Sequence, residues 1–578
     1  MSTDADRDEA RALETIRAAF DGGVRLFDTA RAYGVDGADE GHNERLVARA
    51  LSGREGGRVV TKCGMRREGW IPDGRASTIA RDAAASAIAL GRPLDVLLLH
   101  APDPRTPLVT SVRALDRARK DGVARSIGVS NVSRKQLEEI ATVARVDVVE
   151  IALGAYDDAA VRGGVVAWCA ERGVELLAHS PLGGPARAPR LARDVRLRAL
   201  AERAGATAHE LVLAYLLAVH PSIMLLVGAR RANAAASAVA AARIALDDEL
   251  LFALDARFPG LALLRRPPPR PPETSTREVV ILMGIPGAGK STAAKAYVDR
   301  GHVRLNRDTV GGTLAGIAKR LDEVLRKGAT GVVLDNTYVS RASRSEVVRI
   351  AHTHGAHVRC VHFDTPPHEA QRNVVSRMLE RHGALLGPKE IASLSKRDPT
   401  ALGPNALRRL LGELEAPAPE EGFASVDVVT FTRRHDPRAT ARGAAIALDA
   451  IARRAGDGYA LAADARAIFD DLPAGSRALV FGWIPDASPA LVASTTALLR
   501  EAHGAELALC THLAGPPLCW CRPPLPGLWL AFARAHGLDA RASVLVGTGA
   551  SHASMARALE MTYLERPLTG ASSPPRTA

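Results

Sequence analysis

Short apolar runs alternate with longer stretches of helical spacing over residues 1–263. Seven of these runs are candidates for buried strands: VRLFDTA, RVVTKC, DVLLLHA, ARSIGVSN, VDVVEIAL, VELLAHS and IMLLVGA. Strict alternation of strands with amphipathic helices predicts a parallel sheet with helices outside it. Seven candidates over this length predict a (β/α)8-type barrel that lacks one strand.

A proline-rich segment divides this part from the rest of the chain. LRRPPPRPPETSTR, residues 264–277, can form neither a helix nor a central strand and is predicted to be an extended linker. VVILMGI, GVVLDNT and HVRCVHFD predict a second α/β domain over 278–436. RALVFGWI, ELALCTH and ASVLVGT predict a third, Rossmann-like α/β domain over 437–566, followed by a disordered tail at 567–578. We therefore expect an α/β multidomain protein.

The charge balance bears on the partners. The net charge of +12 and the isoelectric point near 9.7 favour polyanionic partners such as nucleic acid. The other interpretation is that arginine is abundant throughout, as a GC-rich genome would impose. Charge alone leaves both open.

Several classes of protein are excluded. No apolar run reaches the roughly 18 to 20 residues that cross a bilayer. The polar N-terminus MSTDADRDEA is unlike a secretory signal. Six cysteines in a chain this long do not form a disulfide framework. We expect a cytoplasmic protein without a membrane partner.

Four residues at or near the ends of barrel strands carry the chemistry of this part: Asp28, Tyr33, Lys62 and His100. A barrel places its active site at the C-terminal ends of its strands. Each residue type alone is more often structural, but the four together favour a catalytic set. They resemble the tetrad of the aldo-keto reductases. The resemblance implies that Tyr33 donates a proton to a carbonyl, that Lys62 paired with Asp28 stabilises the phenolate, and that His100 orients the substrate.

The same resemblance implies NADPH as hydride donor and a small carbonyl compound as substrate. Its cofactor-binding residues would be Ser130, Asn131, Arg230 and Arg231. His179 stands where an aromatic residue usually stacks on nicotinamide, and Glu150 stands where glutamine is usual. Family members begin with a hairpin and a first barrel strand, whereas this chain begins inside the first helix. A start codon assigned too late and a degenerate scaffold both explain the difference.

The segment GIPGAGKST matches the phosphate-binding pattern G-x-x-x-x-G-K-[ST] between an apolar strand and a helix. Its predicted nucleotide-binding residues are Gly284, Gly287, Gly289, Lys290, Ser291 and Thr292. Glycines let backbone N–H groups face the phosphates, and the helix N-terminus adds its dipole. Lys290 would bridge phosphate oxygens of ATP, and Ser291 would bind Mg²⁺.

Residues further along indicate how an acceptor is activated. Asp308 follows the next strand and is a candidate general base, or else a helix N-cap. Asp335 ends GVVLD near the expected metal. Arg372, Asn373 and Arg377 lie on a helix that could close over ATP; Arg377 could instead lie on a solvated helix face.

This part of the chain resembles the kinase module of polynucleotide kinase-phosphatases in the order and spacing of three segments: NRDT, LDNT followed by SRASR, and the helix with R-N-x-x-x-R. The resemblance covers about 278–390. It implies phosphorylation of 5′-hydroxyl ends of DNA or RNA, with Asp308 as general base and Arg377 stabilising the transferring charge. A kinase of small metabolites, of the zeta-toxin or gluconate-kinase kind, shares the loop and a lid and remains the rival.

A cysteine and histidine cluster lies near the C-terminus: Cys510, His512, Cys519 and Cys521. Thiolate and imidazole ligands from two short turns can complete a tetrahedral Zn²⁺ site, and a buried group of reduced thiols is the other interpretation. CWCRPPLPGL also resembles the zinc-bearing phosphatases of the haloacid dehalogenase superfamily.

Those phosphatases need an aspartate nucleophile in D-x-D-x-T and acidic Mg²⁺ ligands. If LVFGWIPDAS is the first strand, Gly482 and Ile484 replace the carboxylates. Pro523 replaces a lysine, and Thr548 replaces a metal-binding aspartate. The resemblance therefore implies an inactive phosphatase-like domain.

Three functions follow as hypotheses. The first is an ATP-dependent nucleic-acid 5′-hydroxyl kinase, of use in nucleic-acid end repair, attached to a reductase-like barrel. The second is an NADPH-dependent carbonyl reductase whose kinase acts on a related metabolite. In the third, the barrel and the C-terminal domain are interaction modules around the kinase. The sequence does not choose DNA over RNA, name the carbonyl substrate or give the oligomeric state.

Overall fold

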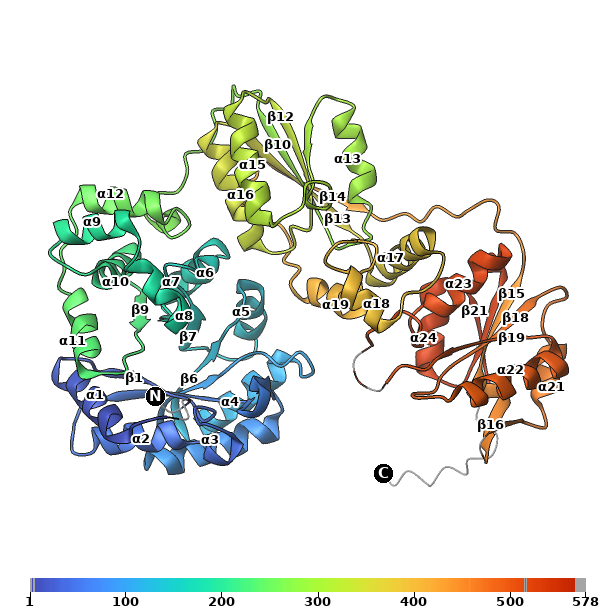
Figure 1. Cartoon of the computed structure of the whole chain (residues 1–578), viewed down its shortest axis with the longest axis horizontal. Helices are drawn as coiled ribbons and strands as arrows, with labels where there is room; N and C mark the ends of the chain where they lie inside the picture. The colour runs from blue at the N-terminus through green and yellow to red at the C-terminus, as the bar shows by residue number, and fades with distance from the viewer. Residues whose placement is uncertain (1–2, 4–5, 457, 514, 516, 567–578) are drawn as a thin grey trace. The chain divides into compact units, whose positions relative to one another are not determined.

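The computed structural model describes residues 3, 6–456, 458–513, 515 and 517–566 (Figure 1). The chain divides into two compact units, Met1–Arg270 with Arg341–Arg349, and Pro271–Ser340 with Ile350–Ala578. None of the helices in the described ranges combines the length and the apolar character that a bilayer crossing requires. The predicted tail, 567–578, lies outside the described residues.

A seven-stranded parallel sheet forms the first unit. Its strands follow one another in chain order: β1 (Leu26–Asp28), β2 (Arg58–Cys63), β5 (Leu94–Leu99), β6 (Ala124–Ser130), β7 (Val148–Ala152), β8 (Glu175–His179) and β9 (Ile223–Leu226). All seven predicted strands are present. They curve into a nearly closed barrel whose edges among the described residues are β1 and β9, and helix α1 (Glu9–Asp21) packs against α11 (Ala232–Ala241).

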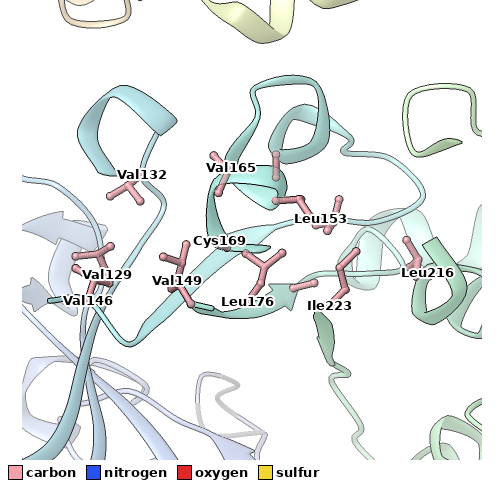
Figure 2. Close-up of a cluster of buried hydrophobic side chains, with 14 of the residues drawn as sticks. Val129, Val132, Val146, Val149, Leu153, Val165, Cys169, Leu176, Leu216 and Ile223 are labelled. Carbon is pink, nitrogen blue, oxygen red and sulfur yellow. The ribbon is translucent and has the colours of Figure 1, made fainter. Parts of the chain in front are cut away.

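Helices cover the outside of this sheet. The main ones are α2 (His42–Leu51), α3 (Ala76–Leu90), α4 (Leu108–Lys120), α5 (Arg134–Ala141), α7 (Val165–Arg172), α9 (Val195–Arg203), α10 (Ala208–Val219) and α12 (Asp248–Arg257). Figure 2 shows part of the core, where Val149 and Leu176 of the strands face Val165 and Cys169 of α7. Burying both layers removes apolar surface from water, which is the main force holding such a barrel together.

A five-stranded parallel sheet begins the second unit, in the order β11-β12-β10-β13-β14. The strands are β10 (Glu278–Met283), β11 (Val303–Leu305), β12 (Gly331–Asp335), β13 (His357–Asp364) and β14 (Ser425–Thr430). Its helices include α13 (Lys290–Val298), α14 (Arg307–Val310), α15 (Leu314–Arg326), α17 (Pro367–His382), α18 (Pro388–Leu394) and α19 (Pro404–Gly412). The strand order reverses at β10, and ligands of open parallel sheets bind where this happens.

A second five-stranded parallel sheet completes this unit, in the order β19-β18-β15-β20-β21. The strands are β15 (Gly443–Ala447), β18 (Arg477–Trp483), β19 (Glu506–Cys510), β20 (Val544–Gly547) and β21 (Thr562–Glu565). Helices α22 (Pro489–His503), α23 (Gly527–His536) and α24 (Ala550–Leu559) flank it. The sequence interpretation of LVFGWIPDAS as the first strand is wrong, because the first and central strand is β15.

Candidate active sites

The barrel gathers the predicted tetrad around one buried lysine. Lys62, at the end of β2, is 1% exposed and donates to the two carboxylate oxygens of Asp28 at 2.5 and 2.6 Å. The Tyr33 hydroxyl lies 3.5 Å from Lys62 Nζ. The rings of Tyr33 and His100 meet edge-on with their centroids 5.7 Å apart. All four side chains thus lie together at the carboxyl ends of β1, β2 and β5.

Burial sets the protonation of this cluster. It lowers the pKa of His100 to about 3, with the Lys62 charge acting in the same direction, so the imidazole is neutral at neutral pH. Burial also raises the pKa of Tyr33 against the opposing pull of Lys62. Burial alone would lower the pKa of Lys62, but the combined effect of Asp28, Tyr33 and Glu150 outweighs it and the pKa rises. A neutral imidazole and a protonated phenol are the states that orient a carbonyl and protonate it.

Glu150 adds a second carboxylate to the same lysine. It lies on β7, is 3% exposed, and its Oε2 is 3.3 Å from Lys62 Nζ. Burial raises the pKa of Asp28 to about 7, and the Glu150 charge contributes to that rise while Lys62 opposes it. Two carboxylates, the half-buried Asp28 and the buried Glu150, therefore compete for one ammonium. The sequence shows Glu150 only as a departure from the usual glutamine, because its contact with Lys62 joins two strands, β7 and β2, that are not adjacent in the sheet.

The predicted carboxamide-binding residues form part of the same strand edge. Asn131 donates from Nδ2 to the His100 carbonyl at 3.0 Å and to Ser130 Oγ at 3.1 Å. His179 Nε2 lies 3.1 Å from Asn131 Oδ1. Asn131 and Ser180 have φ values of 60° and 59°, a left-handed conformation that costs energy outside glycine and is concentrated at functional sites.

Trp70 belongs to this site and was missed in the sequence. Its ring centroid lies 6.3 Å from that of Tyr33 and 6.2 Å from that of His100, both in edge contacts. The side chain is 42% exposed. A single exposed tryptophan in the loop after β2 carries no motif, so only the fold reveals its position beside the tetrad.

Arg230 and Arg231 lie apart from the tetrad, in the segment after β9. Together with Asp6, Arg7 and Arg11 near the start of the chain they line a cavity of about 410 Å³. The four arginines of this lining outnumber its two carboxylates, Asp6 and Asp8. The cavity can therefore hold an anionic group such as a phosphate.

The phosphate loop has the shape its sequence predicts. Gly284, Gly287 and Gly289 all have positive φ, at 153°, 88° and 96°. A Cβ at Gly287 would lie 2.6 Å from the Ala370 carbonyl of α17, so this position requires glycine for close packing as well. The loop leads directly into α13, whose first residues are Lys290, Ser291 and Thr292.

Lys290 is buried and donates to two loop carbonyls, Gly284 O at 2.7 Å and Ile285 O at 2.9 Å. Burial lowers its pKa to about 8; the charge of Arg377 acts in the same direction, and those of Asp335 and Asp308 oppose it. The charges of both predicted acidic residues and of Arg377 thus act on the lysine that would meet the phosphates. Within the described residues Lys290 forms no salt bridge.

The N-cap interpretation of Asp308 is wrong. Asn306 caps α14 instead, accepting from Asp308 N at 2.7 Å and Thr309 N at 3.1 Å. The Asp308 side chain is exposed in the first turn of this helix. Asp335, in contrast, is 2% exposed and pairs with Arg304 of β11, a residue that the sequence did not single out.

The predicted residues of helix α17 contact different parts of the protein. Asn373 donates from Nδ2 to the Gly287 carbonyl at 2.8 Å and so joins the phosphate loop. Arg372 does not close over the nucleotide site as predicted, because its guanidinium pairs with Glu369 and with Glu560 after α24, at 3.5 and 3.1 Å. Helical spacing alone does not tell which partner a buried arginine finds.

The cysteine cluster forms as predicted. Ligand atoms of Cys510, His512, Cys519 and Cys521 all lie within 4.8 Å of one another. Cys510 Sγ is 3.7 Å from Cys519 Sγ and 3.5 Å from His512 Nδ1. A tetrahedral site with Zn–S bonds near 2.3 Å places its sulfurs about 3.8 Å apart. The Cys510–Cys519 pair matches this distance, the Cys519 and Cys521 sulfurs are closer at 3.1 Å, and the donor set is one that binds zinc. Hydrogen bonds from Cys519 and Cys521 lower the pKa of Cys510, which favours a thiolate at this position.

A further polar group lies at the switch point of the third sheet. Asp449 directly follows β15 in the short helix α20 (Leu448–Ile451) and accepts from Thr548 Oγ1 at 2.9 Å. His552 Nδ1 accepts from Thr548 N at 3.2 Å. The earlier inference that no carboxylate lies here is wrong, because β15 was not identified as a strand.

Comparison with known proteins assigns two regions. Residues 2–257 match the aldo/keto reductase family, and residues 279–392 match an AAA domain. The chain thus contains an N-terminal aldo-keto reductase domain and a P-loop domain of the AAA type. Both are domains of enzymes.

Curated relatives resemble one region each. An aldo-keto reductase of Gibberella moniliformis is 29% identical over 188 residues, which are 32% of this chain and 55% of that protein. A bifunctional polynucleotide phosphatase/kinase of Schizosaccharomyces pombe is 30% identical over 156 residues, which are 27% of this chain and 34% of that protein. The chain therefore spans about half the length of the first relative and about a third of the second.

Among solved structures, a thermostable aldo-keto reductase is 27% identical, with 44% of this chain and 90% of that chain covered and a TM-score of 0.39. An aldo-keto reductase from Klebsiella pneumoniae, solved with NADPH, is 23% identical, with 45% and 88% covered and a TM-score of 0.39.

Proposed function

We propose that the P-loop domain, residues 278–436, is an ATP-dependent kinase that phosphorylates 5′-hydroxyl ends of DNA or RNA. The observation that carries the proposal is the phosphate loop with its buried Lys290, on whose pKa the charges of Asp308, Asp335 and Arg377 all act. The likeness to a polynucleotide phosphatase/kinase supports a nucleic-acid acceptor, as does the net charge of +12.

The proposed reaction follows from this grouping. Asp308 takes the proton of the 5′-hydroxyl, whose oxygen bonds to the γ-phosphorus while the bond from that phosphorus to the bridging oxygen of ADP breaks. Lys290 and Arg377 stabilise the negative charge on the transferring group. Ser291 would hold Mg²⁺, with Asp335 beside it, and the ion supplies further positive charge to the phosphates.

Asp308→Asn tests the role of the base. With labelled ATP and 5′-hydroxyl DNA and RNA oligonucleotides, the wild type transfers label, and the variant loses about 10² to 10⁴ of the rate because its amide accepts no proton. ATP affinity stays unchanged, which serves as the folding control. Transfer to sugars or small alcohols with none to oligonucleotides would instead support the metabolite kinase.

A second candidate function belongs to the barrel. The tetrad around Lys62 supports reduction of a small carbonyl compound, with Tyr33 giving the proton and His100 orienting the oxygen. The arginine-lined cavity beside Arg230 and Arg231 fits the adenosine phosphate of NADPH, and Ser130 with Asn131 would hold the carboxamide. NADPH supplies the hydride when bound.

Quenching of protein fluorescence by NADPH tests this function. Binding that is lost in Arg230→Ala with Arg231→Ala supports the assignment of the cavity. A wild-type chain that binds no NADPH would leave the barrel without an oxidoreductase role.

We also propose zinc at the cysteine cluster and an inactive phosphatase-like role for the third sheet. Asp449 occupies the first carboxylate position of a D-x-D pattern, but Ile451 occupies the second, and Thr548 stands where a metal-binding aspartate is expected. One carboxylate without a general acid or metal ligands does not complete phosphate hydrolysis.

A further inference from the structure

A tryptophan inside the cysteine cluster is buried in the core of the P-loop domain. Trp520 lies between Cys519 and Cys521, is 0% exposed, and packs in the same apolar cluster as Met378 of α17. Its indole N–H donates to the Leu402 carbonyl at 2.7 Å. The turn that supplies two metal ligands therefore also supplies an anchor for the neighbouring domain.

The segment that receives Trp520 is the helical part of the P-loop domain after α17. Ile391 of α18 and Leu407 of α19 belong to the same apolar cluster. The contact continues at the ligands, because a Cβ at Gly387 would lie 3.8 Å from His512 Nε2 and one at Gly403 would lie 3.8 Å from the Leu518 carbonyl. The cysteine cluster and this helical segment thus pack directly against each other.

Helix α17 connects that packing to the phosphate loop. Its Met378 lies in the Trp520 cluster, while Asn373 donates to the Gly287 carbonyl at 2.8 Å and Ala370 packs against the same glycine. Arg377, one residue before Met378, is close enough to lower the pKa of Lys290. Since side chains in a close-packed core move together, a displacement of Trp520 reaches α17 and the loop.

A bound metal would control the position of Trp520. Four ligands that converge from two turns are held at fixed separations only when an ion neutralises their charges and bonds to each. Without the ion, the turn keeps its ordinary hydrogen bonds, among them His512 O with Trp483 Nε1 at 2.9 Å. The ligand bonds to Cys519 and Cys521 would fix the backbone on both sides of Trp520.

We propose that metal binding at the cysteine cluster positions Trp520, and that Trp520 in turn holds α17 against the phosphate loop. Trp520 is a positioning residue for nucleotide binding, and the third domain acts on the P-loop domain through its metal. This inference rests on the proposed kinase and on the proposed zinc site.

The experiment compares full-length wild type with Cys519→Ser and Trp520→Ala. Metal content per chain, MgATP affinity by calorimetry and amide hydrogen exchange of α17 are measured for each. Cys519→Ser is expected to lose the metal, and both variants are expected to lose exchange protection in α17 and to bind MgATP about tenfold more weakly. Trp520→Ala retains metal, which separates the anchor from the ligands.

Matched controls lie in the barrel. Cys169→Ser and Trp168→Phe alter a buried cysteine and a buried tryptophan of the first unit and should change none of the three measurements. Trp520→Phe covers the case in which Trp520→Ala fails to fold, since it keeps one aromatic ring in the core while removing the donor to Leu402 and the second ring of the indole. It is expected to lose part of the α17 protection.

The proposal is overturned if the wild type binds no metal, or if metal-free Cys519→Ser keeps wild-type affinity and protection. It is also overturned if both Trp520 variants behave as the wild type. Because MgATP binding needs no acceptor, absence of transfer to oligonucleotides would defeat the proposed acceptor and leave this test intact.

Discussion

The barrel and the P-loop domain each bury one lysine at the carboxyl ends of parallel strands, but in opposite electrostatic settings. Lys62 faces two carboxylates, Asp28 and Glu150, with the nearest oxygen at 2.5 Å. Lys290 donates only to the neutral carbonyls of Gly284 and Ile285 and forms no salt bridge within the described residues. The charge of Lys62 is neutralised by carboxylates of the protein, whereas the charge of Lys290 remains available to pair with an anionic ligand.

This difference accounts for the opposite pKa shifts of two lysines that are both buried. Burial alone lowers the pKa of a lysine. At Lys62 the carboxylates reverse that effect and raise the pKa, while at Lys290 burial prevails and the pKa falls to about 8. A site that transfers a proton needs charges fixed in advance, and a site that binds a triphosphate needs a cation still able to pair with it.

The largest effect is expected where an internal partner is removed. Lys62→Met leaves the half-buried Asp28 and the buried Glu150 without a cation, which should lower the free energy of unfolding of the barrel by about 3 to 5 kcal/mol. Hydrogen exchange of the β2 and β5 amides in the full-length chain measures this for the barrel alone.

Lys290→Met is the matched comparison. It removes no internal ion pair, so the exchange of the β10 amides should be equal or slower, while phosphoryl transfer falls by about 10³ because the phosphates lose their cation. A destabilised β10 in this variant, or a Lys62→Met barrel as stable as the wild type, would contradict the distinction between the two lysines.

Much of this arrangement could be read from the sequence, because both sites depend on residues close to strand ends. The seven barrel strands and the phosphate loop are runs of apolar residues followed by polar ones, so periodicity places Lys62 and Lys290 correctly. The cysteine cluster is equally local, since its four members fall within twelve residues.

What could not be predicted depends on weak local signals or on tertiary partners. Strand β15 reads GAAIA, and alanine and glycine have low strand propensity, so the centre of the third sheet and Asp449 behind it were missed. Arg372 looks like Arg377 in the sequence, and only packing against α24 directs it to Glu560. The role of Glu150 likewise depends on a tertiary partner, Lys62 of β2, a strand that does not pair with β7.

Glu150→Gln tests the comparison further by removing one negative charge from the cluster around Lys62. The amide removes one of two carboxylates that compete for Lys62, so the free energy of unfolding at pH 7 should rise by about 2 kcal/mol. Burial, with the Glu150 charge adding to it, raises the pKa of Asp28 to about 7, so the folded wild type binds more protons than the unfolded chain between about pH 4 and 7. Its stability therefore falls as pH rises through that window.

The measurement for Glu150→Gln is exchange of the β2 amides at pH 5 and pH 7. The variant should show a smaller loss of stability between the two values, because the pKa of Asp28 is lower without Glu150. Glu150→Asp, which keeps the charge, should retain the wild-type slope. Equal slopes in wild type and Glu150→Gln would mean that Glu150 does not contribute to the raised pKa of Asp28.

The smallest predicted effect concerns Lys290 and has the opposite sign. Its pKa is lowered by burial to about 8, below the ordinary 10.5, so the unfolded chain binds more protons between these values and stability rises with pH there.

Nucleotide affinity is expected to fall as pH rises, because only the protonated ammonium of Lys290 attracts phosphates. At pH 9 about one-tenth of the free protein carries that charge, so MgATP affinity should fall about tenfold between pH 7 and pH 9. Lys290→Met should show weak, pH-independent binding over the same range. A wild-type affinity that stays constant to pH 9 would mean that Lys290 is fully protonated throughout, and that the electrostatic contrast with Lys62 is smaller than the burial of the two side chains implies.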